Sequence, residues 1–131
     1  TPFVDRFKKN FVTGDSRWID LNEINIQSLL EDNKIIFVDI TADWCVTCQY
    51  NKNFVIYTKE IQNLFERFEV LQVQGDWTVP DENIRAFLSN YNTFGIPFNI
   101  LYSPKEPRGI ILPELITKKS IKDALLHTRE E

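Results

Sequence analysis

Apolar and polar residues follow one another along this chain in blocks that predict strands and helices in turn. Residues 35–40, "IIFVDI", are β-branched, nearly all apolar and bounded by polar residues, as in a buried strand. Residues 69–74, "EVLQVQ", alternate as a half-buried strand does. "PFNILY" from Pro97 and "RGIIL" from Arg108 predict two more strands, and the turn residues "SPKEP" between them predict a hairpin.

Residues typical of helices lie between these strands. Residues 18–21 could form a further short strand, ahead of the first of these helices and strands. Most of the expected helices begin at a capping residue that is followed by apolar residues at helical spacing. Strands that alternate with helices and end in a hairpin predict an α/β sandwich, with a central mixed β-sheet flanked by helices. The expected helix starts are Asn22 or Asn25 (ending near Asp32), a position near Cys45 (running through Asn53 or beyond), Thr58, Asp81 and Thr117.

The first residues have a pattern of their own. Phe3, Phe7 and Phe11 lie at i, i+4 and i+8, which suits a helix, and its end at Gly14 could be a linker. We therefore expect residues 1–17 to be an N-terminal tether or leading helix, and residues 18–131 to form one domain. The chain begins with Thr-Pro and contains no methionine, so we expect it to be a processed or excised part of a longer protein.

Composition limits the classes of function. The 131 residues are 43% hydrophobic and 26% charged, which is ordinary for a soluble globular domain with its own core. The net charge of −4 argues against recruitment of nucleic acid, and the small basic clusters at residues 8–9 and 118–122 suit solvated helix faces. No apolar run approaches the ~20 residues of a membrane helix, so no direct membrane insertion of this fragment is expected.

Both cysteines lie in "DITADWCVTCQYNK", residues 39–52, and three interpretations are open. A structural disulfide between Cys45 and Cys48 closes so small a ring that it contributes only ~2 kcal/mol before strain is subtracted. A zinc site needs four ligands, and the single histidine, His127, lies in a polar C-terminal helix end where a surface position is expected. We therefore expect neither a metal nor another cofactor, and the remaining interpretation is a redox centre.

The redox interpretation explains more of the neighbouring residues. A strand that ends near Ile40 and a CxxC that opens a helix place Cys45 at the positive helix N-terminus, which stabilises the attacking thiolate. Cys48 follows one turn later, close enough to close the disulfide. Asp39 either faces solvent at the strand end or lies under the pair as a carboxylate that exchanges protons with Cys48. Trp44 either belongs to the core or shields one side of the disulfide and offers partners an apolar surface.

The Ile96-Pro97 pair in "FGIPFNI" opens a predicted strand, where proline removes a hydrogen-bond donor. An ordinary edge strand would accommodate this proline. A cis peptide bond would also accommodate it, and would turn the Ile96 backbone outward so that it can pair with a docked peptide.

Three stretches, "FVDITADWCVTCQYNK", "GIPFNILY" and "ILPEL", together resemble the thioredoxin fold. More narrowly, they resemble the C-terminal domain of DsbD-type thiol:disulfide interchange proteins, and ADWC-x-x-C is the most specific part. The resemblance extends over residues 18–127. It implies that Cys45 is the attacking cysteine and Cys48 the resolving one. It also implies that Asp39 is the buried acid beneath them and Pro97 the cis-proline facing the disulfide.

Lys52 departs from the family pattern, because many members have a second acid seven residues after the first cysteine. Lys52 lies four residues after Cys48 on one helix face, so it could reach toward Asp39. Tuning of the cysteines by two carboxylates is therefore in doubt for this chain.

In that family the parent protein spans the inner membrane of Gram-negative bacteria. The resemblance implies a periplasmic domain that takes electrons from a membrane-embedded domain and passes them to an N-terminal periplasmic domain. That domain in turn reduces disulfide isomerases and cytochrome c maturation factors. The expected activity is protein-disulfide reduction without a bound cofactor. The alternatives are a stand-alone thioredoxin-like reductase and a binding module whose cysteine pair is redox-inert.

Overall fold

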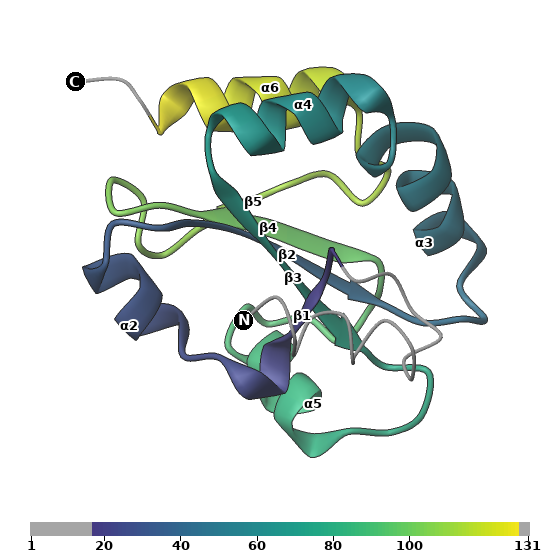
Figure 1. The fold of residues 1–131 in the computed structure, drawn as a ribbon. Coiled ribbons are helices and arrows are strands. Elements are labelled where there is room, and N and C mark those ends of the chain that lie inside the picture. Colours follow the sequence, from purple (N-terminus) through teal and green to yellow (C-terminus); the bar gives the residue numbers. More distant parts are fainter. Residues whose placement is uncertain (1–16, 129–131) are drawn as a thin grey trace, which may run out of the picture.

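The computed structural model describes residues 17–128, in which helices cover both faces of one β-sheet (Figure 1). No helix within these residues is long and apolar enough to cross a membrane. In chain order the elements are β1 (Ile19–Asp20), a 3₁₀ turn (Leu21–Glu23), α2 (Ile26–Glu31), β2 (Ile35–Thr41), α3 (Val46–Asn51), a π-helical segment (Lys52–Ile56), α4 (Lys59–Arg67), β3 (Val70–Asp76), α5 (Glu82–Ser89), β4 (Phe98–Tyr102), β5 (Ile110–Ile111) and α6 (Lys118–His127).

The sheet has the strand order β1-β3-β2-β4-β5, so β2 is its middle strand. β3 runs parallel to both β1 and β2, whereas β4 is antiparallel to β2 and to β5. The predicted α/β sandwich with a central mixed sheet is confirmed. The predicted hairpin between β4 and β5 is confirmed as well.

The two faces of the sheet belong to two separate cores because side chains alternate along each strand. Phe37 of β2 packs into one core with residues of α4, α6 and the π-helical segment. Ile36, Val38 and Ile40 pack into the other core, with residues of α2 and α5. Figure 1 shows the same division, with α3, α4 and α6 above the sheet and α2 and α5 below it.

Four of the predicted helix caps are confirmed. The side chains of Asn25, Thr58, Asp81 and Thr117 each accept a hydrogen bond from a backbone N–H in the first turn of the following helix. The alternative cap at Asn22 is wrong, because that residue lies in the 3₁₀ turn. The helix expected from Phe3, Phe7 and Phe11 lies outside the described residues.

The strand ends differ from their predictions, as β3 and β5 illustrate. β3 continues through Gly75 and Asp76, two residues past the end of the strand predicted at residues 69–74. Gly75 pairs with Ile40 of β2, and a Cβ at this glycine would lie 2.7 Å from Ile40 Cδ1, so any larger residue would displace the end of that side chain. β5 has only two residues instead of the expected five, and Pro113, which cannot donate a ladder hydrogen bond, lies soon after its end.

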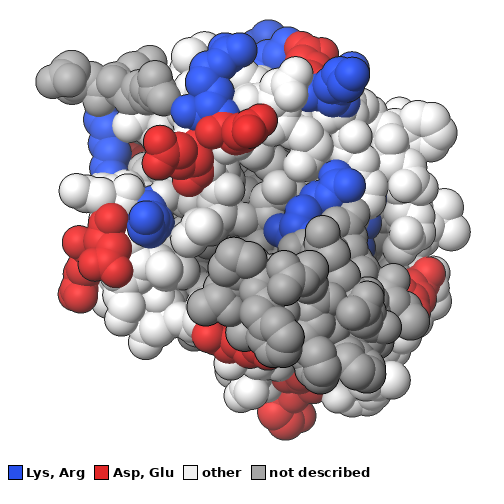
Figure 2. All heavy atoms as spheres, viewed as in Figure 1, with Lys and Arg blue, Asp and Glu red and all other residues white. Residues whose placement is uncertain are grey.

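Charged residues of both signs are interspersed on the face shown in Figure 2. Between α4 and α6, Glu60 pairs with Lys118 and Lys122, and within α6 Lys119 pairs with Asp123. The basic cluster at residues 118–122 is therefore a solvated helix face, as predicted. The cluster at residues 8–9 lies outside the described residues.

Candidate redox site

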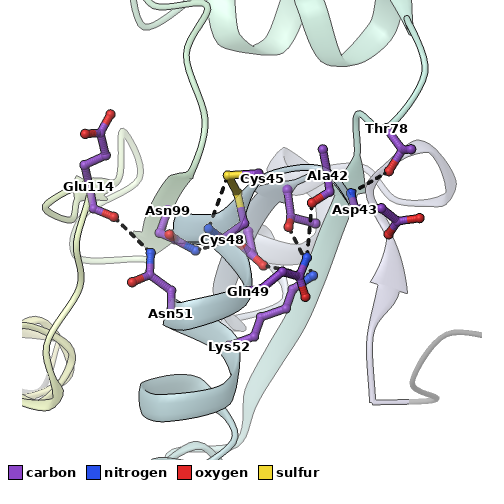
Figure 3. The surroundings of a disulfide bond; sticks show 12 residues. Ala42, Asp43, Cys45, Cys48, Gln49, Asn51, Lys52, Thr78, Asn99 and Glu114 are labelled. Carbon is purple, nitrogen blue, oxygen red and sulfur yellow. Dashed lines mark hydrogen bonds and ion pairs between the residues drawn. A yellow bond between two sulfur atoms is a disulfide. The ribbon is translucent and has the colours of Figure 1, made fainter.

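The two cysteines form a disulfide at the N-terminus of α3 (Figure 3). Cys45 is the N-cap residue, and its Sγ accepts a hydrogen bond from the Cys48 backbone N–H at 3.2 Å. The two Cα atoms lie 5.2 Å apart, which is within the usual range for a disulfide. Cys45 is 8% exposed and Cys48 only 1%, so Cys45 is the more accessible of the pair.

The short connection from β2 to α3 is held by several hydrogen bonds. The Ala42 carbonyl accepts from the Cys45 backbone N–H at 3.2 Å and from Gln49 Nε2 at 3.1 Å. The Asp43 backbone N–H donates to Thr78 Oγ1, in the loop that follows β3, at 2.9 Å. These bonds fix the position of the disulfide relative to the carboxyl ends of the parallel strands.

Asp39 lies in the middle strand and is only 2% exposed. The alternative that it faces solvent at a strand end is therefore wrong. Burial raises the pKa of its carboxyl group to about 6, although Lys52 and a hydrogen bond from Asn99 act in the opposite direction. A carboxyl group with such a pKa can take up and release a proton near neutral pH.

Lys52 begins the π-helical segment and points into the protein, toward the sheet. Its Nζ donates to Thr41 Oγ1 at 3.1 Å and lies 3.9 Å from Asp39 Oδ2. The prediction that Lys52 reaches toward Asp39 is confirmed. A cation thus faces the buried acid at the position where many members of the resembled family carry a second acid. The expected helix over these residues continues past Asn51, but as a π-helix rather than an α-helix.

Sequence reasoning missed two buried amides near the disulfide. Asn99 of β4 is the register partner of Asp39, and its Nδ2 donates to Asp39 Oδ1 at 2.8 Å. Asn51 of α3 donates to the Glu114 carbonyl at 2.9 Å and accepts from the Ile116 backbone N–H at 3.3 Å. The signal for Asn99 was available, because it interrupts an apolar strand just as Asp39 does. Asn51 gave no comparable signal.

Trp44 is 63% exposed, so the alternative that it belongs to the core is wrong. Its indole N–H donates to the Thr78 carbonyl at 3.1 Å, which holds the ring against the loop after β3. Val46, the first residue of α3, is also exposed. The disulfide is thus bordered by exposed apolar side chains that a partner could contact.

The Ile96–Pro97 peptide bond is cis, as predicted. Pro97 directly precedes β4, which lies between β2 and β5, so an edge strand does not explain this proline. Ile96 packs against the small cluster formed by Ala42 and the two cysteines. The cis peptide therefore lies beside the disulfide.

Taken together, the disulfide at a helix N-terminus and the titratable acid suit reversible exchange between a dithiol and a disulfide. This chemistry needs two thiols and proton transfer, and it requires no bound metal or organic group. Asn99 and Lys52, which both contact Asp39, lie among the surroundings of the disulfide in Figure 3, so the buried acid is near the cysteines.

A family described as Thioredoxin-like matches residues 17–104 of the chain. The thiol:disulfide interchange protein DsbD of Tatumella citrea is 31% identical over 64 residues, which are 49% of this chain and 11% of that protein. The protein of the same name from Haemophilus ducreyi is 26% identical over 77 residues, 59% of this chain and 13% of that protein. The chain thus corresponds to a small part of these relatives.

Solved structures show the same fold. The C-terminal domain of Neisseria meningitidis DsbD, in its reduced form, superposes with a TM-score of 0.64 at 20% identity, covering 79% of this chain and 90% of that domain. A thioredoxin from Thermus thermophilus superposes with a TM-score of 0.62 at 17% identity, covering 85% of each chain.

Proposed function

Because this chain belongs to the thioredoxin-like family, we propose that it is a protein-disulfide reductase of the DsbD type, which relays electrons between two other domains of its parent protein. The observation that carries the proposal is the CxxC disulfide at the N-terminus of α3, the helix that follows the strand with the buried, titratable Asp39. Cys45 and Cys48 perform the exchange, and no cofactor takes part.

The reaction proceeds in two exchange steps. The reduced domain starts with a Cys45 thiolate, which attacks one sulfur of the partner disulfide; a mixed disulfide forms and the other partner sulfur leaves as a thiolate. Cys48 then loses its proton to the Asp39 carboxylate and attacks Cys45 Sγ. The Cys45–Cys48 bond forms, the bond to the partner breaks, and the partner leaves with both electrons as a dithiol once its thiolates are protonated.

Exposure and position support this division of roles. Cys45 caps the helix and is the more exposed sulfur, so a partner reaches it first. Cys48 is enclosed and close to the sheet, which suits the resolving step. Trp44 and the Ile96–Pro97 peptide border the pair, and the Ile96 backbone pairs with the partner segment that carries the disulfide. Lys52 lowers the pKa of the buried Asp39 carboxyl group, so that this group can still ionise.

The relay has a donor and an acceptor. A membrane-embedded domain of the parent protein reduces this domain, and an N-terminal domain of the parent accepts the electrons and reduces disulfide substrates and cytochrome c maturation factors. The domain therefore resides in the periplasm, as part of an inner-membrane protein of a Gram-negative bacterium, and residues 1–17 tether it. The support is the similarity to DsbD proteins of such bacteria over part of their length.

The test is a covalent trap. With Cys48 replaced by serine, the reaction stops at the mixed disulfide, so Cys48→Ser should accumulate a reducible adduct through Cys45 in extracts of cells that make the parent protein. Cys45→Ser is the matched control and should trap nothing. Mass spectrometry should identify the parent's N-terminal domain in the adduct. Adducts with many unrelated proteins would indicate a stand-alone reductase, and no adduct would indicate an inert binding module.

A further inference from the structure

A polar pocket of about 510 Å³ lies beside α3, at the carboxyl ends of the parallel strands. Thr41, Gln49, Lys52 and Asn53 contribute to its wall, whereas the cysteines, Trp44 and the Ile96–Pro97 peptide do not. In Figure 3, Gln49 and Lys52 lie on one side of α3 and Asn51 and Glu114 on the other. The pocket therefore shares no wall residue with the cysteines, Trp44 or the cis peptide, although it reaches Asp43 next to Trp44.

The two oxygens of the Asp39 carboxyl group have different surroundings. Oδ1 accepts a hydrogen bond from Asn99 Nδ2 at 2.8 Å. Oδ2 is buried, has no hydrogen-bond partner among the described residues, and lies 3.9 Å from Lys52 Nζ. The carbonyl oxygen of a carboxylic acid is its better acceptor, so the hydrogen bond to Oδ1 favours Oδ2 as the oxygen that carries the proton.

Lys52 connects this oxygen to the pocket. Its Nζ donates to Thr41 Oγ1, which leaves two N–H groups for Asp39 or water, and its side chain is 11% exposed and lines the pocket. Among the described residues, four carboxylates and one lysine line the pocket, so the summed charge of these side chains is negative and favours the release of a proton there. The carboxylates are those of Asp20, Asp43, Asp76 and Asp81.

We propose that this pocket, with Lys52 at its inner wall, is the route by which Asp39 exchanges its proton with solvent while a protein partner covers the disulfide. This inference rests on the proposed function. When Cys48 attacks Cys45 Sγ, its proton passes to Asp39 and the electron pair of the broken bond leaves on the partner sulfur. Asp39 then releases the proton from Oδ2 past Lys52 into the pocket, and the partner thiolate takes up a proton from bulk water.

A comparison of two oxidants distinguishes this route from an effect of Lys52 on the protonation of Asp39 alone. Insulin with its disulfides intact is a protein and covers the disulfide surface of the domain during the reaction. 5,5′-Dithiobis(2-nitrobenzoate) is small and leaves that surface open to water. In single-turnover oxidation of the reduced domain, Lys52→Met should slow formation of the Cys45–Cys48 disulfide roughly tenfold with insulin and less than about twofold with the small reagent. Lys52→Arg keeps the cation and should restore most of the rate.

Two further variants separate the route from damage to the fold. Asn53→Trp fills the pocket from an exposed position and leaves Lys52 in place, so it should reproduce the selective slowing with insulin. Lys59→Met makes the same chemical change at an exposed residue of α4 and should change neither rate.

Equal slowing with both oxidants would overturn the route, because Lys52 would then act only on the protonation of Asp39. Unchanged rates in both Lys52→Met and Asn53→Trp would overturn it as well. A wild-type domain that reacts with neither oxidant would instead overturn the proposed function, and this inference with it.

Discussion

The two faces of β2 are built from alternate residues of one strand and serve different ends. On the face toward α2 and α5, Ile36, Val38 and Ile40 are all fully buried and apolar. On the face toward α3, Phe37 belongs to the apolar core, but the next residues on this face, Asp39 and Thr41, are polar and contact Lys52. The first face contributes stability along its whole length. The second contributes stability at one end and chemistry at the other.

The polar end of the second face is unfavourable for folding. A buried carboxyl group whose pKa is raised from 3.8 to about 6 destabilises the folded state at neutral pH, relative to a neutral side chain. Lys52 and Asn99 reduce this penalty without removing it. A protein accepts such a group where function requires it, which is consistent with its place in the strand that leads to the cysteines.

The largest effect is expected on the apolar face. Ile36→Ala removes a fully buried side chain and leaves a cavity, so the free energy of unfolding should fall by about 2–5 kcal/mol. The Asp39 pKa should not change, because Ile36 lies on the other face of the sheet. Urea denaturation measures the first quantity and carboxyl ¹³C NMR the second. A loss below about 1 kcal/mol would show that this core is not closely packed.

Asp39→Asn should raise the free energy of unfolding, whereas Ile36→Ala lowers it. Because the folded-state pKa lies above the unfolded value, the contribution of Asp39 is most favourable below about pH 3.8 and is lost as the pH rises through about 6. The variant should therefore be about 2–3 kcal/mol more stable than the wild type at pH 7, and the gain should fall to about 1 kcal/mol near pH 4.5. It should also resolve mixed disulfides more slowly. Denaturation at several pH values tests this, and a gain that does not depend on pH would contradict it.

Asn99→Leu should have a smaller effect, which is limited to the pKa of Asp39. The hydrogen bond from Asn99 stabilises the carboxylate, so its loss should raise the Asp39 pKa further, by about one unit. Asn51→Leu is the matched control, since Asn51 is an equally buried amide that binds the loop at Glu114 and Ile116 instead. NMR titration should show a shift in the first variant and none in the second. Equal shifts in both would mean that the fold around α3 has changed.

Much of this arrangement was predictable from the sequence, because short-range patterns determine it. The alternation of strands and helices, four helix caps and the hairpin all follow from local residue types, and Asp39 and the cysteines were recognisable in one stretch. The remainder depends on which strands become neighbours. Asn99 meets Asp39 only because β4 pairs with β2 in a particular register, and the last residues of β3 pair with the end of β2, where Gly75 lies beside Ile40. Such contacts leave little trace in a single sequence.

The central claim is that the Cys45–Cys48 pair is a reducing redox couple, and equilibrium titration against dithiothreitol or glutathione buffers tests it most directly. "CVTC" contains no histidine to stabilise the Cys45 thiolate, and Asp39 and Asp43 oppose its charge, so the helix N-terminus is the main favourable influence. We expect a two-electron transition nearer ~−270 mV than ~−120 mV. A potential at the oxidising end, or a pair that does not exchange with the buffer at all, would contradict the account.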